Sequence, residues 1–270
     1  MGKSCREGFP ALVAFDLDDT LAPSKSALSP EMCRALALLL EVRPVCIISG
    51  GRFSQLEEQV LRRLPASAQV DQLHIMPTCG TRYMRFRDGG WTQLYAHDLS
   101  QAERDTAIAA LENRARQLGL WEPDDIVRGG RIEDRGSQIT FSALGQQATV
   151  AVKKAWDPSG DKRERLRAAV AADLPDLEVR AGGSTSIDIT RRGIDKAHGM
   201  KELATHTGIS LDDMLFVGDR LEPGGNDYPV RALGVACHAV TGPDETLEFL
   251  ARLTPALHSG SEPALDLLPA

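Results

Sequence analysis

Residues 11–20, ALVAFDLDDT, constrain the fold of this chain more than any other stretch. The first half of the stretch is apolar without alternation, which is typical of a strand buried on both faces of a parallel sheet. The apolar run ends at Asp16, and Asp18 follows two residues later. Ligands of open α/β sheets bind beyond the carboxyl ends of the strands, and side chains two residues apart share a face. We therefore expect both carboxylates to lie at a site.

Two carboxylates held close together repel each other unless a cation or a shared proton offsets their charge. A hard divalent ion such as Mg²⁺ prefers oxygen ligands and would suit Asp16 and Asp18. Acidic residues after an apolar run are also typical of a surface turn. Taken alone, the stretch leaves both interpretations open.

The bulk properties exclude several classes of protein. A chain of 270 residues, 42% of them hydrophobic, is long enough for one or two domains with a real core. The formal net charge of -7 argues against a nucleic-acid partner, and no apolar stretch is long enough to cross a membrane. The five cysteines form no CxxC pair, which favours reduced thiols in a cytoplasmic protein over disulfides or a zinc site.

Strands and helices alternate in the first part of the chain. Ser29 and Pro30 form a typical helix start, and the apolar residues 45–49 predict the next buried strand. Gly50 turns that strand into a second helix, predicted over about 53–64, and a third strand is predicted over 74–79. This alternation indicates an α/β fold with a doubly wound parallel sheet.

The rhythm changes near residue 97. An exposed hairpin is predicted over 82–94, and Ser100 with Glu103 forms a capping box that begins a long helix. The segments that follow predict an inserted α+β domain: strands over 131–134 and 138–142, a helix over 160–172, and strands over 177–180 and 186–190.

The α/β rhythm resumes at Lys196. The remaining elements are predicted as a helix to Thr207, a strand over 214–217, a loop over 218–227, a strand over 234–240 and a helix after Pro243, with the tail beyond Thr254 frayed. We therefore predict a core domain made of residues 1–95 and 191–270, and an inserted cap domain made of residues 96–190.

Polar side chains follow the predicted parallel strands, where they would share one edge of the sheet. Such a set suits phosphoryl transfer, in which a carboxylate attacks phosphorus while cations and donors hold the phosphoryl oxygens. We expect Asp16 to attack, Asp18 to act as general acid and base, and Ser49 and Lys196 to hold oxygens. The predicted Mg²⁺ site consists of Asp16, Asp18 (through its main-chain carbonyl), Asp219, Asn226 and Asp227.

These residues resemble the haloacid-dehalogenase superfamily of phosphotransferases. Its DxDxT motif is matched by residues 16–20, although Asp19 stands where the family usually has glycine. Ser49 matches the second motif and Lys196 the third. Gly218 with Asp219, followed by Asn226 with Asp227, matches the acidic fourth motif.

Within that superfamily the chain is most similar to the eukaryotic-type phosphomannomutases, which carry a C2-type cap. The phrases SGGRFSQLEEQV, GDRLEPGGNDYPV, AGGSTSIDITRRGIDK and VTGPDET carry this resemblance. The resemblance implies Mg²⁺, a phosphorylated sugar as substrate and a homodimer paired through the caps. It also implies that the substrate is bound by Gly50 beside Ser49 and by Arg135, Ser186 and Asp188.

Two positions depart from the mutase pattern. Lys25 stands where the family usually has an arginine, and Gln146 stands where the mutases carry another phosphate-binding arginine. A neutral amide cannot make the charge-assisted contacts of a guanidinium. A mutase needs strong anion sites at both ends of its substrate, whereas a phosphatase does not. These departures favour a sugar-phosphate phosphatase, with phosphomannomutase activity as the alternative.

Two further classes compete with an enzyme. Phospho-receiver modules also use an acceptor aspartate and a lysine on an α/β sheet, but a leaving-group acid such as Asp18 has no use in a stable phospho-switch. A catalytically silent binding protein could keep the fold. The complete set of acidic residues and the inserted cap argue against both.

Overall fold

The computed structural model describes residues 9–182 and 185–260. The chain forms two compact units, one made of residues 1–95 and 195–270 and the other of residues 96–194. The second boundary falls after Ile194 rather than after residue 190. The last strand of the second unit still pairs Arg191 with Leu177, and the N–H of Ile194 donates to the carbonyl of Arg191.

The first unit is built on a seven-stranded sheet with the order β11-β10-β1-β2-β3-β4-β5. Its first five strands in that order are mutually parallel, and the chain moves outward from β1 in both directions, as in a doubly wound fold. This confirms the predicted fold class. The strands are β1 Leu12–Phe15, β2 Val45–Ile48, β3 Leu73–Met76, β4 Arg82–Arg87, β5 Gly90–Ala96, β10 Met214–Gly218 and β11 Ala236–Ala239.

The predicted hairpin over 82–94 forms, but it is not a separate exposed element. β4 pairs antiparallel with β3 and β5 lies beside β4, so the hairpin extends the central sheet. Tyr83 and Met84 are buried in the process. Three arginines of β4, at positions 82, 85 and 87, gave the segment its exposed character in the sequence.

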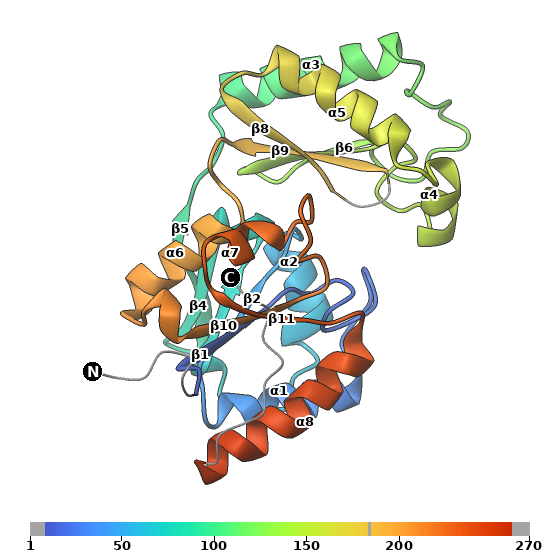
Figure 1. Cartoon of the computed structure of the whole chain (residues 1–270). Coiled ribbons are helices and arrows are strands. Elements are labelled where there is room, and N and C mark those ends of the chain that lie inside the picture. The colour runs from blue at the N-terminus through green and yellow to red at the C-terminus, as the bar shows by residue number, and fades with distance from the viewer. Residues whose placement is uncertain (1–8, 183–184, 261–270) are drawn as a thin grey trace. The chain divides into compact units, whose positions relative to one another are not determined.

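Helices cover both faces of this sheet (Figure 1). Val13 and Phe15 of β1 share one core with α1 Pro30–Leu40 and α8 Pro243–Ser259. Leu12 and Ala14 point the opposite way, into a core shared with α6 Lys196–Thr207 and α7 Tyr228–Ala232. Both faces of β1 are therefore buried, which explains its uninterrupted apolar run.

The helix predicted over 53–64 is present in a different form. It begins as α2 Phe53–Leu56 and continues as one π-helical stretch, Glu57–Leu61. Leu56 and Val60 still reach the core. The other short helical turns of this unit are Val70–Gln72, Thr78–Gly80 and Leu211–Asp213.

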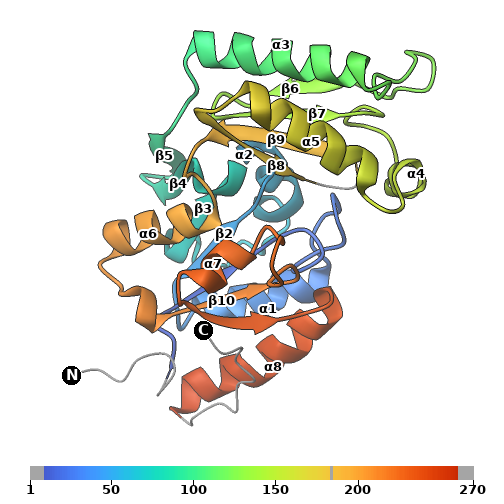
Figure 2. The same cartoon turned by 45° about the horizontal axis from the view of Figure 1, so that its top comes forward.

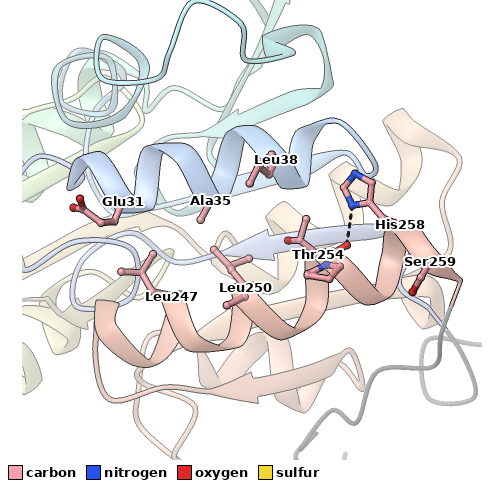
Figure 3. Close-up of a pocket in the computed structure, with 10 residues that line it drawn as sticks. Glu31, Ala35, Leu38, Leu247, Leu250, Thr254, His258 and Ser259 are labelled. Atoms are coloured by element: carbon pink, nitrogen blue, oxygen red, sulfur yellow. Dashed lines mark hydrogen bonds between the residues drawn. The ribbon is translucent and has the colours of Figure 1, made fainter.

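The predicted fraying beyond Thr254 is wrong for the residues that the structure describes. α8 continues to Ser259, because Leu253 and Leu257 are buried in the core. Pro255 lies inside this helix, and the His258 ring Nδ1 contacts the carbonyl oxygen of Thr254 at 2.9 Å. A largely apolar pocket of about 850 Å³ lies between α1 and α8 and contains none of the predicted site residues (Figure 3). Residues 261–270 lie outside the described residues.

The second unit is an α+β module, as predicted. Its antiparallel sheet has the order β6-β7-β9-β8, formed by β6 Ile132–Asp134, β7 Gln138–Ser142, β9 Ser186–Arg191 and β8 Leu177–Ala181. Helices α3 Gln101–Gln117 and α5 Asp161–Asp173 cover one face (Figure 2). Ile139, Phe141, Ile187 and Ile189 pack beneath them. The capping box of Ser100 and Glu103 is confirmed.

A short helix, α4 Val150–Trp156, was not predicted. Its valines at 150 and 152 are exposed while Lys153 is buried, so its pattern of polarity is the reverse of an ordinary amphipathic helix. Among the described residues, no helix combines the length and the apolar composition that a bilayer span requires.

Candidate active site

The carboxylates of three aspartates meet at one edge of the first unit's sheet. Asp16 follows β1 directly, and its N–H donates to the carbonyl of Val217 on β10. Asp219 follows β10, which pairs with β1, and Asp227 lies eight residues further on. One oxygen from each of Asp16, Asp219 and Asp227 lies within 4.8 Å of the other two. These three form the acidic cluster.

Lys196 inserts its ammonium into the acidic cluster. It is the first residue of α6, whose N-cap Asp195 accepts the N–H of His198 at 3.1 Å. Lys196 Nζ lies 2.5 Å from Asp16 Oδ1 and 2.6 Å from Asp227 Oδ1. All three side chains are buried, so the two ion pairs are shielded from water. The lysine therefore fixes the positions of both carboxylates.

The cluster carries more negative than positive charge. Burial raises the pKa of Asp16 well above its usual range, although Lys196 acts in the opposite direction. Burial and the neighbouring Asp227 raise the pKa of Asp219 to about 6. Burial alone would lower the pKa of Lys196, but Asp16 and Asp227 outweigh it and raise that pKa, so Lys196 stays charged. Three carboxylates and one ammonium suit a hard divalent cation with oxygen ligands.

The glycine-rich loop 218–227 brings Asp227 into the cluster. The N–H of Arg220 donates to Asp227 Oδ2 at 3.1 Å. A Cβ atom on Gly218 would lie 2.5 Å from the same oxygen, and one on Gly225 would collide with the carbonyl of Arg220. Both positions therefore need glycine. Asn226 is exposed, and its predicted metal role stays a prediction.

Asp18 is not one of the three aspartates whose oxygens converge. Its Oδ1 accepts the main-chain N–H of Lys25 at 2.6 Å. β1 ends at Phe15, and the carbonyl of Leu17 then accepts the N–H of Leu21 in a turn, so the period of a strand does not apply at Asp18. The predicted acid–base role of Asp18 stays a prediction.

The same turn accounts for the departure at residue 19. Asp19 has a φ of 58°, a left-handed conformation that favours glycine and that aspartate adopts more readily than most residues. Its Oδ1 accepts the N–H of Ser24 at 3.0 Å. An aspartate is therefore compatible with this position.

Ser49 lies at the end of β2, which neighbours β1 in the sheet. The residue is buried, and its Oγ accepts the N–H of Gly51 at 3.1 Å. A Cβ atom on Gly50 would make only an ordinary contact, 3.8 Å from Cys79 Sγ. Local packing therefore does not require glycine at position 50, and both predicted binding roles stay predictions.

The predicted binding residues of the second unit lie on or beside its sheet. Arg135 forms an ion pair with Glu133, with 2.7 Å between Nη2 and Oε2. Ser186 and Asp188 lie two residues apart on β9 and so share a face. Asp188 Oδ1 accepts the hydroxyl of Thr140 at 2.7 Å.

Comparison with known proteins identifies the family. The model of the eukaryotic phosphomannomutases matches residues 93–255, more than half of the chain. This chain belongs to the eukaryotic phosphomannomutase family. The phosphomannomutase of Schizosaccharomyces pombe is 26% identical over 91% of this chain and 95% of the relative, and that of Spinacia oleracea is 25% identical over 88% and 94%.

Solved structures support the fold. A Plasmodium falciparum IMP-nucleotidase superposes with a TM-score of 0.70 at 15% identity, covering 96% of this chain and 71% of that one. The C-terminal domain of Candida albicans trehalose-6-phosphate phosphatase gives 0.65 at 17% identity, covering 93% of each chain. With its family membership, this makes the chain an enzyme of the haloacid-dehalogenase superfamily with phosphotransferase or phosphatase activity.

The sequence did not predict the position of one buried cation of this phosphomannomutase-family enzyme, Lys153. Lys153 of α4 is 95% buried, and its Nζ donates to the main-chain carbonyl of Gln146 at 3.2 Å. The main-chain N–H of Gln146 donates to the carbonyl of Gly130, which holds this loop in place. Lys153 and Lys154 are adjacent in the sequence, and nothing there distinguishes the buried lysine from its exposed neighbour.

Proposed function

We propose that this enzyme is a phosphomutase that transfers a phosphoryl group between the 1- and 6-positions of a hexose, with mannose phosphates as the first candidates. The family match carries this proposal: it spans residues 93–255 and so includes the whole of the second unit, where we expect the sugar to bind. The relatives named phosphomannomutase align over both units. The comparisons therefore support the mutase over the phosphatase that we expected from the sequence.

Lys153 weakens the main argument for a phosphatase. That argument rested on the missing arginine at position 146. The ammonium of Lys153 lies against the main chain of Gln146, so a positive charge is present beside this position after all. A distal phosphate at this place would meet a cation, as a mutase requires.

The proposed reaction begins with attack of an Asp16 carboxylate oxygen on one phosphorus atom of an activating hexose bisphosphate. The bond between phosphorus and the sugar oxygen breaks, the bond to Asp16 forms, and Asp18 protonates the leaving oxygen. In the second half, a hexose monophosphate binds with its own phosphate at the distal position. Asp18 takes the proton of its free hydroxyl, which attacks the phosphoaspartate and forms the bisphosphate again. Lys196 holds Asp16 in place throughout, and Ser49 donates to a phosphoryl oxygen.

We further propose Mg²⁺ as the cofactor, bound by Asp16, Asp219 and Asp227. When bound, it offsets the charge of the transferring phosphoryl group. The described cysteines, Cys33, Cys46, Cys79 and Cys237, are not joined in disulfides, which supports a cytoplasmic location. We propose a homodimer by analogy with related mutases, and light scattering coupled to gel filtration would test it.

Hydrolysis is the second candidate, because Gln146 and Lys25 both depart from the mutase pattern. The two activities are separated by incubating the enzyme with mannose 1-phosphate and Mg²⁺, with and without an activating hexose bisphosphate. A mutase forms mannose 6-phosphate faster than inorganic phosphate. Release of phosphate without the 6-phosphate isomer would overturn the proposal, and Asp16→Asn provides the inactive control.

A further inference from the structure

The sheet of the second unit has one polar face. In register, Glu133 of β6 pairs with Thr140, Thr140 pairs with Asp188, and Asp188 pairs with Arg180 of β8. Residues paired across strands lie on the same face of a sheet. The opposite face holds the apolar core under α3 and α5. Asp188 is therefore in the middle of a polar row that crosses all four strands.

A directed chain of hydrogen bonds ends at Asp188. Gln138 Nε2 lies 2.8 Å from Thr140 Oγ1, and Thr140 Oγ1 lies 2.7 Å from Asp188 Oδ1. An ionised carboxylate can only accept, so the single hydroxyl hydrogen of Thr140 points to Asp188. The threonine oxygen must then accept from the amide NH₂ group of Gln138. Each of these bonds fixes the direction of the next one.

The orientation of Gln138 has a cost. Its side chain is completely buried, and its Oε1 atom has no hydrogen-bond partner. A buried acceptor left unsatisfied destabilises the folded state. An apolar residue at this position would avoid that cost, so packing alone does not account for a glutamine here. The donor of Gln138 toward Thr140 is the feature that an apolar residue would lack.

We propose that Gln138 and Thr140 are positioning residues that hold the Asp188 carboxylate as an acceptor for one hydroxyl of the sugar ring. This inference rests on the proposed function, since it names the group that recognises the sugar. It predicts selectivity for polyhydroxylated phosphate esters over esters without ring hydroxyls. Gly182 packs closely against the Asp188 carboxylate, because a Cβ atom on Gly182 would lie 2.7 Å from Asp188 Oδ2. Rotation of the carboxylate is restricted on that side, which preserves the orientation that Thr140 sets.

The test compares Thr140→Val, which keeps the shape but removes the donor, with Thr140→Ser, which keeps the donor. We expect Thr140→Val to lower the ratio of kcat/KM for mannose 1-phosphate to that for an aryl phosphate about tenfold or more, mainly through KM. Thr140→Ser should restore the ratio to within about threefold. Thr190→Val is the matched control, because Thr190 lies on the same sheet and its hydroxyl donates to Ile194 instead.

A double-mutant cycle tests whether Thr140 acts through Asp188. If it does, Thr140→Val combined with Asp188→Asn will be no worse than Asp188→Asn alone. Additive losses, or an unchanged ratio in Thr140→Val with thermal melting that shows a folded protein, would overturn the inference. A wild-type enzyme that turns over aryl phosphate but no sugar phosphate would instead overturn the proposed function. The two failures are therefore distinguishable.

Discussion

The ammonium of Lys196 lies 2.5 Å from Asp16 Oδ1, although the two residues are 180 positions apart. Both side chains are buried, and the same ammonium contacts Asp227 at 2.6 Å. The proposed nucleophile is therefore held by a residue that follows the inserted unit in the sequence. We therefore expect the proposed catalysis and the stability of the first unit to depend on the same contact.

Replacement of Lys196 by methionine should affect both properties. Without the ammonium, two buried carboxylates lose their counter-charge, which is expected to destabilise the fold by about 3–5 kcal/mol and abolish turnover. Urea unfolding in the presence of a chelator measures the first effect. Lys201→Met, at an exposed position of the same helix, is the control. A Lys196→Met protein as stable as wild type would contradict the structural role.

Replacement of Asp16 and replacement of Asp18 should have different effects on covalent phosphorylation of the enzyme. Asp16→Asn removes the nucleophile, so no covalent phosphate should form. Asp18→Asn removes the acid and base and should slow turnover about 10²–10⁴-fold. Labelled aryl phosphate, whose leaving group needs no proton, should still phosphorylate Asp16 in that variant. Covalent label in Asp16→Asn, or its absence from Asp18→Asn, would contradict the assigned roles.

Stabilisation by Mg²⁺ should depend on pH. The raised pKa values of Asp16 and Asp219 mean that the folded protein binds more protons than the unfolded chain. Without metal, this contribution makes stability fall as the pH rises from about 4 to about 6 and beyond. Mg²⁺ offsets the negative charge of the ionised carboxylates, so it should raise Tm more at pH 7.5 than at pH 5. An equal rise at both pH values, or none, would argue against the proposed ligands.

Lys25 allows charge and backbone strain to be separated. Its φ of 60° favours glycine, and its N–H donates to Asp18. Lys25→Gly and Lys25→Ala both remove the ammonium and should raise KM for a sugar phosphate to a similar extent. Alanine keeps the strain while glycine relieves it, so Lys25→Gly should be more stable by about 1 kcal/mol. Chemical denaturation of the two variants gives this difference directly. Equal stabilities would show that the turn is not strained.

Lys153 should matter for the phosphate at the far end of the substrate. Its replacement by methionine removes one charge-assisted contact, expected to raise KM for mannose 1-phosphate about tenfold or more. The exposed Lys154→Met differs by one position and should behave like wild type. If the two variants give the same KM, Lys153 does not bind phosphate. Gln146→Arg then becomes the informative variant for the ratio of isomer to free phosphate.

The sequence predicted most of the strands because their signal is local. The apolar run before Asp16 requires burial on both faces, and the helix begun by Lys196 ends at Thr207 as expected. The DxDxT stretch, the lysine and the acidic loop also indicated the chemistry from residue types alone. The predictions failed where the structure depends on contacts with other elements. β4 joins the central sheet by pairing with β3, and burial of leucines in the core extends α8 beyond Thr254.

By itself, the sequence determined the doubly wound α/β core, the inserted α+β module and the superfamily, since each depends on periodicity and on short motifs. Only the tertiary structure decided which charges meet. Pairing of β1 with β10 brings Asp16 to Asp219, and packing of α6 brings Lys196 to Asp16. It also turned Asp18 toward Lys25 and buried Lys153 beside Gln146. Coulomb interactions depend on distance through space, and separation along the chain does not fix that distance until the sheet order is known.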